Sequence, residues 1–261
     1  MRLLTSILEI VAVSIAIGAI LTLGVRRAFG ERERLLSNDG GSPALRAITA
    51  TYALLLAFVL VVSLQSFENA RQKSVTEADA VVSLSNSTLL LPAPSRKHVG
   101  RALACYAQTV VDREFPTMAT GRPVSDDDAA LKAIYTSLPN PTHAPAAQTS
   151  VETVFLGQLS ALTTARDARI RSARSNLPPL LWVVVLGGAI VVLLALSAIT
   201  FVDRPWPQMW LLSGATAIIV AAILLISALN SPFASQAVKI DARPMRAALQ
   251  VVSEGIPRPY C

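Results

Sequence analysis

Four arginines lie close together near the end of a long polar segment of the chain. Their guanidinium groups are always charged and present several N–H donors that suit carboxylates, phosphates and other anions. At about 100° per residue the four side chains cover a broad half of a helix rather than a narrow stripe. Two interpretations follow, a collar that contacts lipid headgroups or a vestibule that attracts small anions, and both involve Arg166, Arg169, Arg171 and Arg174.

The other ionisable residues are weaker candidates for a functional site. Glu9 is a carboxylate inside an apolar run, and its place near the chain start favours a side chain that reaches the membrane interface. The three aspartates at 126–128 point in different directions on a helix, so we expect them to cap that helix and predict no metal site. His98 and His143 are expected at the solvated surface.

Signatures of catalysis and of cysteine chemistry are missing from the sequence. It contains no glycine-rich phosphate loop, no HExxH motif and no nucleophile elbow, so we predict neither an enzyme nor a cofactor. Cys105 and Cys261 have no CxxC spacing and no nearby histidine pair. We therefore expect neither a disulfide scaffold nor a zinc site.

The composition predicts a protein that crosses a membrane several times. The 261 residues are 52% hydrophobic and only 15% charged, with a mean hydropathy of +0.51. Apolar runs predict four transmembrane helices, at residues 3–25, 48–64, 180–202 and 206–229, the last two forming an antiparallel hairpin. The net charge of +6 is explained by arginines beside these spans, which indicates anionic lipid headgroups as partners and not nucleic acid.

Between the second and third spans, periodic apolar residues predict a bundle of helices at 65–91, 95–115, 125–138 and 149–176. No alternating strand pattern occurs there, so the fold class is all-α. The expected organisation is transmembrane helices with a short basic loop at 1–64, a soluble helical insert at 65–178, a transmembrane hairpin at 179–230 and a tail at 231–261. In the tail, residues 244–252 predict a short helix and residues 255–261 a frayed end.

The second span predicts an unusual helix, because neither proline nor glycine separates it from the insert. One continuous helix should run from residue 48 to about residue 91. It should carry Phe58 on the face that copies of the chain would share. Four spans place both termini and the insert on one side of the membrane. More Lys and Arg residues flank the spans on that side, which favours a cell-membrane protein with a cytoplasmic insert.

Several short motifs follow one another between about residues 52 and 249. They include residues 56–58, 66–70, 77–78, Tyr106, residues 112–116, Pro179 with Trp182, and residues 230–233. In their order and spacing these motifs resemble the bestrophin-like domain family of bacterial membrane proteins. The positions taken as family motif residues are Phe67, Glu68, Asn69, Glu114, Pro232 and Phe233.

The resemblance implies a function as well as a fold. Bestrophins are pentameric anion channels in which an aromatic stripe of the second span lines a narrow neck, so the likeness implies a homo-oligomer with Leu54 and Phe58 facing the pore. The chain lacks the tryptophan pair and the acidic run of the calcium-gated animal channels, which argues against calcium gating. The alternative is a non-conducting membrane scaffold or sensor whose helical domain binds a partner.

Overall fold

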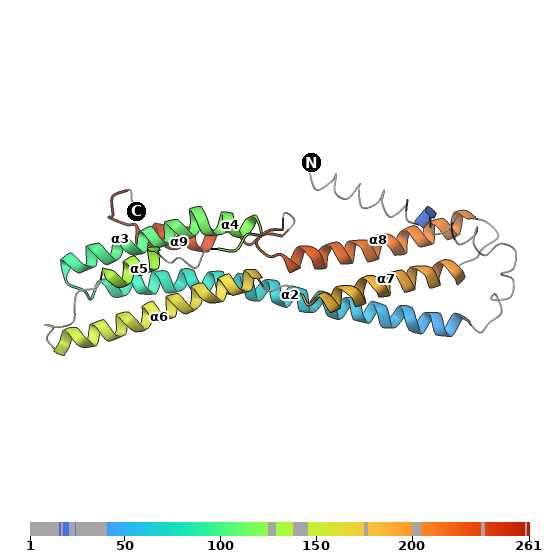
Figure 1. Ribbon diagram of the computed structural model, residues 1–261, viewed down its shortest axis with the longest axis horizontal. Helices are drawn as coiled ribbons and strands as arrows, with labels where there is room; N and C mark the ends of the chain where they lie inside the picture. Colours follow the sequence, from blue (N-terminus) through green and yellow to red (C-terminus); the bar gives the residue numbers. More distant parts are fainter. Residues whose placement is uncertain are drawn as a thin grey trace. The chain divides into compact units, whose positions relative to one another are not determined.

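A computed structural model describes residues 16, 18–20, 24, 41–124, 129–137, 146–174, 177–199, 205–235, 238–258 and 260–261. Every regular element among them is helical, and these residues contain no strand, which confirms the all-α prediction. Figure 1 shows α2 (Gly41–Thr88), α3 (Ala93–Thr109), α4 (Phe115–Ala119), α5 (Ala129–Thr136), α6 (Ala146–Arg174), α7 (Pro179–Ile199), α8 (Pro205–Asn230) and α9 (Arg243–Val252). A π-helical turn, η2 (Val110–Glu114), joins α3 to α4.

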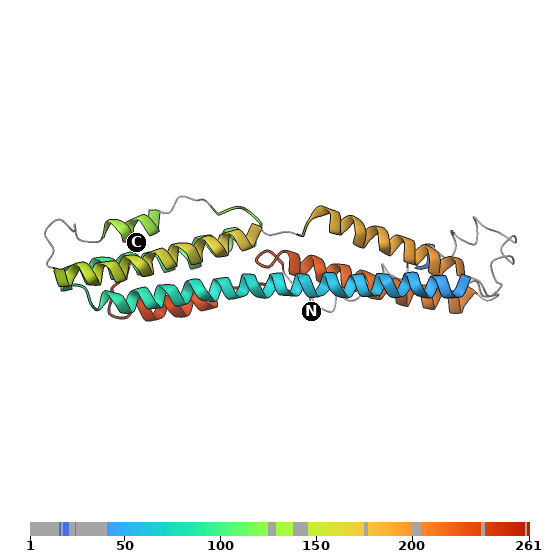
Figure 2. The same cartoon turned by 90° about the horizontal axis from the view of Figure 1, so that it is seen from below.

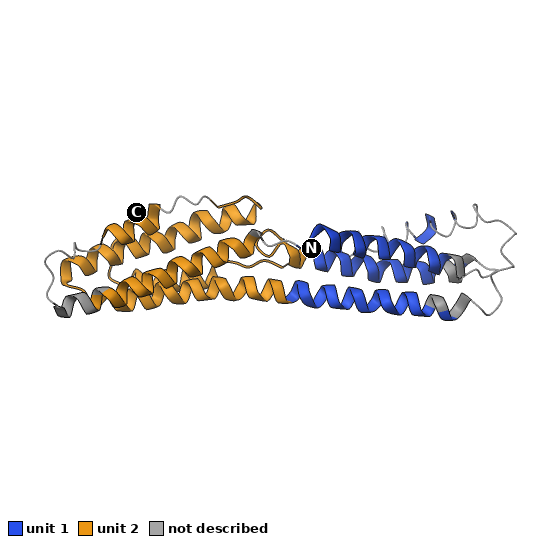
Figure 3. Ribbon diagram, turned by 60° about the horizontal axis from the view of Figure 1, so that its bottom comes forward, with its two compact units in different colours: residues 1–64, 177–227 blue, residues 65–176, 228–261 orange. Residues whose placement is uncertain are grey.

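The chain divides into two compact units (Figure 3). Unit 1 contains residues 1–64 and 177–227, and unit 2 contains residues 65–176 and 228–261. The divisions at 64–65 and 176–177 fall where the sequence changes between apolar and polar. Residues 228–261 are grouped with residues 65–176 in unit 2.

The expected long helix is confirmed, since α2 is 48 residues long and contributes to both units. At about 1.5 Å per residue it measures roughly 72 Å, and Figure 2 shows it without a break. Neither proline nor glycine occurs from residue 44 to residue 88, so nothing removes a hydrogen bond from the helix. A turn at residues 89–91 and then Pro92 end it.

Unit 1 combines the first part of α2 with α7 and α8. Three helices in the described part of the chain are long and apolar enough to cross a membrane, at Arg46–Thr88, Pro179–Ser197 and Met209–Asn230. Most of the expected first span, 3–25, lies outside the described residues. Tyr52 packs closely on α7: its hydroxyl donates to the Val185 carbonyl at 3.0 Å, and a Cβ at Gly188 would lie 2.6 Å from its ring.

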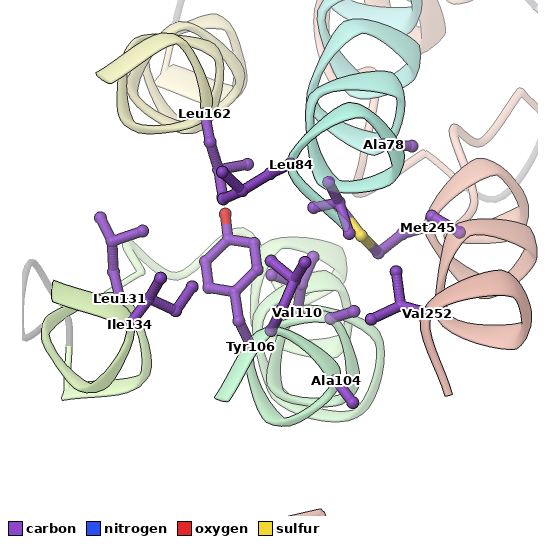
Figure 4. Close-up of a cluster of buried hydrophobic side chains, with 14 of the residues drawn as sticks. Ala78, Leu84, Ala104, Tyr106, Val110, Leu131, Ile134, Leu162, Met245 and Val252 are labelled. Carbon is purple, nitrogen blue, oxygen red and sulfur yellow. The ribbon is translucent and has the colours of Figure 1, made fainter. Parts of the chain in front are cut away.

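Unit 2 has a hydrophobic core to which α2, α3, η2, α4, α5, α6 and α9 contribute. Figure 4 shows Tyr106 of α3 among side chains from α2 (Leu84), α5 (Ile134), α6 (Leu162) and α9 (Met245). All five side chains are at most 2% exposed. The short helix expected in the tail is present as α9, which places Met245, Ala248 and Val252 in this core.

One expectation for the insert is wrong. The helix expected at 95–115 does not end there, because the chain passes through η2 into α4, where Pro116 lies in the first turn and needs no N–H partner. Tyr135 on α5 is 43% exposed, and its hydroxyl lies 3.3 Å from the Thr163 hydroxyl at the surface.

The cysteine prediction is also wrong. Cys105 and Cys261 form a disulfide with their Cα atoms 4.9 Å apart. The two residues are 156 positions apart in sequence, so only the folding of the tail onto α3 brings them together. The frayed end expected at 255–261 is wrong for the same reason: Tyr260 is only 7% exposed.

Candidate functional site

The predicted pore-lining residues lie on an open face of α2. Leu54 and Phe58 are 73% and 68% exposed, and Val61, three residues further along the same face, is 51% exposed. The opposite face is packed, since Val59 is buried in a cluster with Val185 and Ile226. In unit 1, α2 therefore offers one apolar face that is free to contact lipid or another copy of the chain.

Unit 2 contains a cluster of buried charges, formed by Glu77, Tyr106, Glu114, Arg166 and Arg169 and called here the ion-pair cluster. Arg169 donates to both carboxylates, with Nε and Nη2 directed to Glu77 and Nη2 also to Glu114. Arg166 Nη2 donates to Glu114 Oε1 at 2.8 Å. The Tyr106 hydroxyl donates to Glu77 Oε1 at 2.6 Å. None of the five residues is more than 8% exposed.

The register of two helices explains why these charges are inside. On α2, Glu77 follows the buried residues Ala70 and Ser74 and precedes Val81 and Leu84, at the alternating four- and three-residue spacing of a single face. On α6 the same spacing runs through Phe155, Leu159 and Leu162 to Arg166 and Arg169. Both helices thus continue an apolar face with charged residues.

The π-helical turn η2 positions Glu114, the second carboxylate of the ion-pair cluster. Within η2 and the start of α4, the adjacent residues Glu114 and Phe115 are both buried. Phe115 lies beneath Arg169, whose guanidinium carbon is 5.2 Å from the ring centre, and contacts Phe233 edge to face at 5.9 Å. Single π-helical turns within α-helices are frequent at functional sites, and here the turn brings a carboxylate and an aromatic ring to one cation.

Interactions within the ion-pair cluster keep the Arg169 guanidinium charged and the Tyr106 hydroxyl protonated, so proton transfer between the groups is unfavourable. Burial by itself lowers the pKa of the Arg169 guanidinium, but the carboxylates of Glu77 and Glu114 outweigh burial, and the net pKa is raised. Burial and then the neighbouring Glu77 raise the pKa of Tyr106 well above its usual value. Tyr106 is therefore a neutral hydrogen-bond donor near pH 7, and the cluster holds α2, α3, α6 and η2 together.

The expected arginine collar needs correction. Arg166 and Arg169 are 3% and 0% exposed, so they contact carboxylates inside unit 2 and reach neither headgroups nor free anions. Arg171 is exposed, with its guanidinium 4.0 Å from the Asp167 carboxylate. Arg174 ends α6, but its side chain lies outside the described residues. An anion-attracting surface at Arg171 and Arg174 stays a prediction.

The residues of the suspected family motif do not form one site. Glu114 belongs to the ion-pair cluster, and Phe233 reaches the cluster through its contact with Phe115. Pro232 is buried beside Phe233. The other three lie elsewhere on α2: Phe67 packs at the edge of the core, Glu68 is exposed and pairs with Arg71 at 3.3 Å, and Asn69 is exposed.

Sequence reasoning missed the ion pair between Glu77 and Arg169 and the hydrogen bond from Tyr106 to Glu77. The spacing that places Glu77 and Arg169 on apolar faces is the signal that could have found the ion pair. His98 is exposed, as expected. Glu9, residues 126–128 and His143 lie outside the described residues. In the part of the chain that the structure describes, no group of His, Cys, Asp and Glu side chains is arranged to hold a metal ion.

Comparison with known proteins identifies the family. The family model named Bestrophin-like domain matches residues 12–242. A crystal structure of a mutant bacterial Bestrophin homolog from Klebsiella pneumoniae has a TM-score of 0.68 and 10% sequence identity, covering 97% of this chain and 99% of its own. A structure of that homolog solved by Zn-SAD phasing has a TM-score of 0.68 and 12% identity, covering 95% and 97%. No curated protein matches the chain. The chain belongs to the Bestrophin-like family.

Proposed function

We propose that this protein is an oligomeric membrane channel that conducts anions, with the open face of α2 lining the pore. The observation that carries the proposal is the contrast between the two faces of α2 in unit 1. Tyr52 and Val59 pack against neighbouring helices, whereas Leu54 and Phe58 are exposed. A ring of copies that brought these side chains to one axis would form a hydrophobic constriction of the kind that gates pores.

Membership of the Bestrophin-like family supports this proposal, because bestrophins are anion channels. The exposed guanidinium of Arg171 supports the choice of anions, since its contact with Asp167 is a surface ion pair and leaves the charge open to solvent. The multi-pass arrangement, with the helical insert and both termini in the cytoplasm, belongs to the same proposal.

Conductance across planar bilayers tests the proposal. Purified protein should carry a chloride current, and Phe58→Ala and Leu54→Ala should change its conductance or gating by removing part of the constriction. Leu180→Ala is a matched control, because Leu180 on α7 is 72% exposed, almost as much as Leu54. Protein that is folded, monomeric and silent would refute the proposal, as would equal effects of Leu54→Ala and Leu180→Ala.

The alternative function, a non-conducting scaffold or sensor, is favoured by a cavity in unit 2. Its volume is about 340 Å³ and its lining includes Arg122, Phe233 and Ile170, a mixture of polar and apolar groups that suits a small ligand or a partner side chain. A partner identified by pulldown should then bind equally well to wild type and to Phe58→Ala. Loss of partner binding in Phe58→Ala would contradict the scaffold function.

A further inference from the structure

The Cys105–Cys261 disulfide has no part in the proposed channel. The sequence contains two cysteines in all, and the bond joins them across 156 positions, from α3 to the last residue of the chain. Tyr106, the neighbour of Cys105, belongs to the ion-pair cluster. The disulfide therefore ties the end of the chain to the helix that contributes Tyr106.

The described residues of the segment that follows α9 are held by local turns and by side-chain packing. The chain turns at Gly255, whose φ of +77° favours glycine. The backbone hydrogen bonds of its described residues are local, such as Ile256 N–H to the Ser253 carbonyl at 3.0 Å. Packing is limited to side chains, with Ile256 at the edge of the core and Tyr260 7% exposed. The disulfide is thus the one covalent attachment of this segment to α3.

The disulfide is accessible to a small molecule. Cys261 is exposed and Cys105 is half-buried. Both line a cavity of about 530 Å³, whose walls also include Glu114 and Arg166 of the ion-pair cluster. A thiolate can approach the exposed Cys261 from solvent, and Cys261 is itself part of the wall of this cavity.

We propose that Cys105 and Cys261 form a reversible thiol–disulfide site that fastens the segment after α9 to α3 at the edge of this cavity, and that its reductant is a dithiol. A thiolate of the dithiol attacks Cys261 Sγ and forms a mixed disulfide, and the S–S electron pair leaves on Cys105 Sγ, which takes a proton from water. The second thiol of the dithiol then releases the Cys261 thiol and closes the oxidised dithiol. Two electrons and two protons pass to the protein, and a small-molecule disulfide reverses the exchange.

The structure of the site explains the consequence of reduction. The bond closes a loop of more than 150 residues, and such a cross-link restricts a large ensemble of open conformations. Once it is reduced, the described residues of the segment keep their local turns and the packing of Ile256 and Tyr260, so the segment is held less firmly beside the cavity at Glu114 and Arg166. This inference does not depend on whether the protein conducts ions.

Hydrogen exchange of the purified full-length protein tests the attachment. Treatment with dithiothreitol should raise amide exchange in residues 256–261 at least about tenfold while the core of α3 stays protected. The double variant Cys105→Ser/Cys261→Ser should show the fast exchange with or without dithiothreitol. Glu254→Gln, an exposed change in the same segment, should keep the full response. Unchanged exchange after complete reduction, verified by mass, would overturn the proposal.

Thiol trapping in intact cells tests reversibility. Cells that express the protein are treated with dithiothreitol or with the membrane-permeant 2-hydroxyethyl disulfide, quenched with acid and alkylated with a maleimide of known mass. The oxidised fraction should fall with the dithiol and rise with the disulfide. A fraction that neither reagent changes would overturn a reversible site.

Discussion

Arg169 and Glu77 form an ion pair in which both side chains are completely buried, although the residues are 92 positions apart and lie on different helices. Burial of a charge is costly unless the charge is paired and hydrogen-bonded. Here Arg169 also pairs with Glu114, and Tyr106 donates to Glu77. The structure of unit 2 therefore depends on both members of this pair.

Replacement of Arg169 by methionine should be strongly destabilising. The Arg169→Met variant keeps the volume but leaves Glu77 buried without its cation, so the free energy of unfolding should fall by about 3–5 kcal/mol. Thermal unfolding followed by circular dichroism in detergent measures the effect. The control is Arg171→Met on the same helix, where the exposed pair with Asp167 is worth less than about 1 kcal/mol. Similar losses of stability in both variants would show that the cluster is not a stabilising centre.

The Tyr106 hydroxyl should make the stability depend on pH in alkali. Its raised pKa means that the folded protein keeps the proton while the unfolded chain ionises near pH 10. The stability that this provides is complete below about pH 10 and is lost as the pH rises towards the folded pKa, since the unfolded state then binds fewer protons. Wild type should therefore lose more stability than Tyr106→Phe between about pH 9 and 11. Parallel unfolding midpoints across this range would contradict the assignment.

The close contact of Tyr52 with α7 should require glycine at position 188. A Cβ at Gly188 would meet the Tyr52 ring at 2.6 Å, whereas at Gly187 nothing lies within 4 Å. Gly188→Ala should therefore destabilise unit 1 by about 1–3 kcal/mol through overpacking, and Gly187→Ala should be neutral or slightly stabilising because alanine favours helix. The unfolding temperatures of the two variants in detergent provide the comparison. If Gly187→Ala were the more harmful change, the contact would be wrongly assigned.

Much of the helical architecture follows from local sequence. The absence of helix breakers from residue 44 to residue 88 predicts the continuity of α2, and the apolar spacing of Met245, Leu249 and Val252 predicts α9. These features depend on residues that are close along the chain, where propensity and periodicity apply directly. The expected first span, with Glu9, lies outside the residues that the structure describes.

The candidate site depends on contacts between distant segments, and there local reasoning was insufficient. From the sequence alone, Arg166 and Arg169 resemble surface residues, because their partners Glu77 and Glu114 lie in distant segments. Their position on an apolar face of α6 was visible in the sequence, but their partners were not. The disulfide was missed because Cys105 and Cys261 meet only after the tail folds onto α3. The π-helical turn at Val110–Glu114 has no sequence signature that we recognise.

Because α2 is unbroken, the number of residues along it is a structural constraint. In a helix without a break, gain or loss of a single residue turns every residue beyond it by about 100° around the helix axis, whereas a change of seven residues turns them by only about 20°. No glycine or proline interrupts α2 from residue 44 to residue 88. The family is therefore expected to vary in composition along this segment more readily than in length.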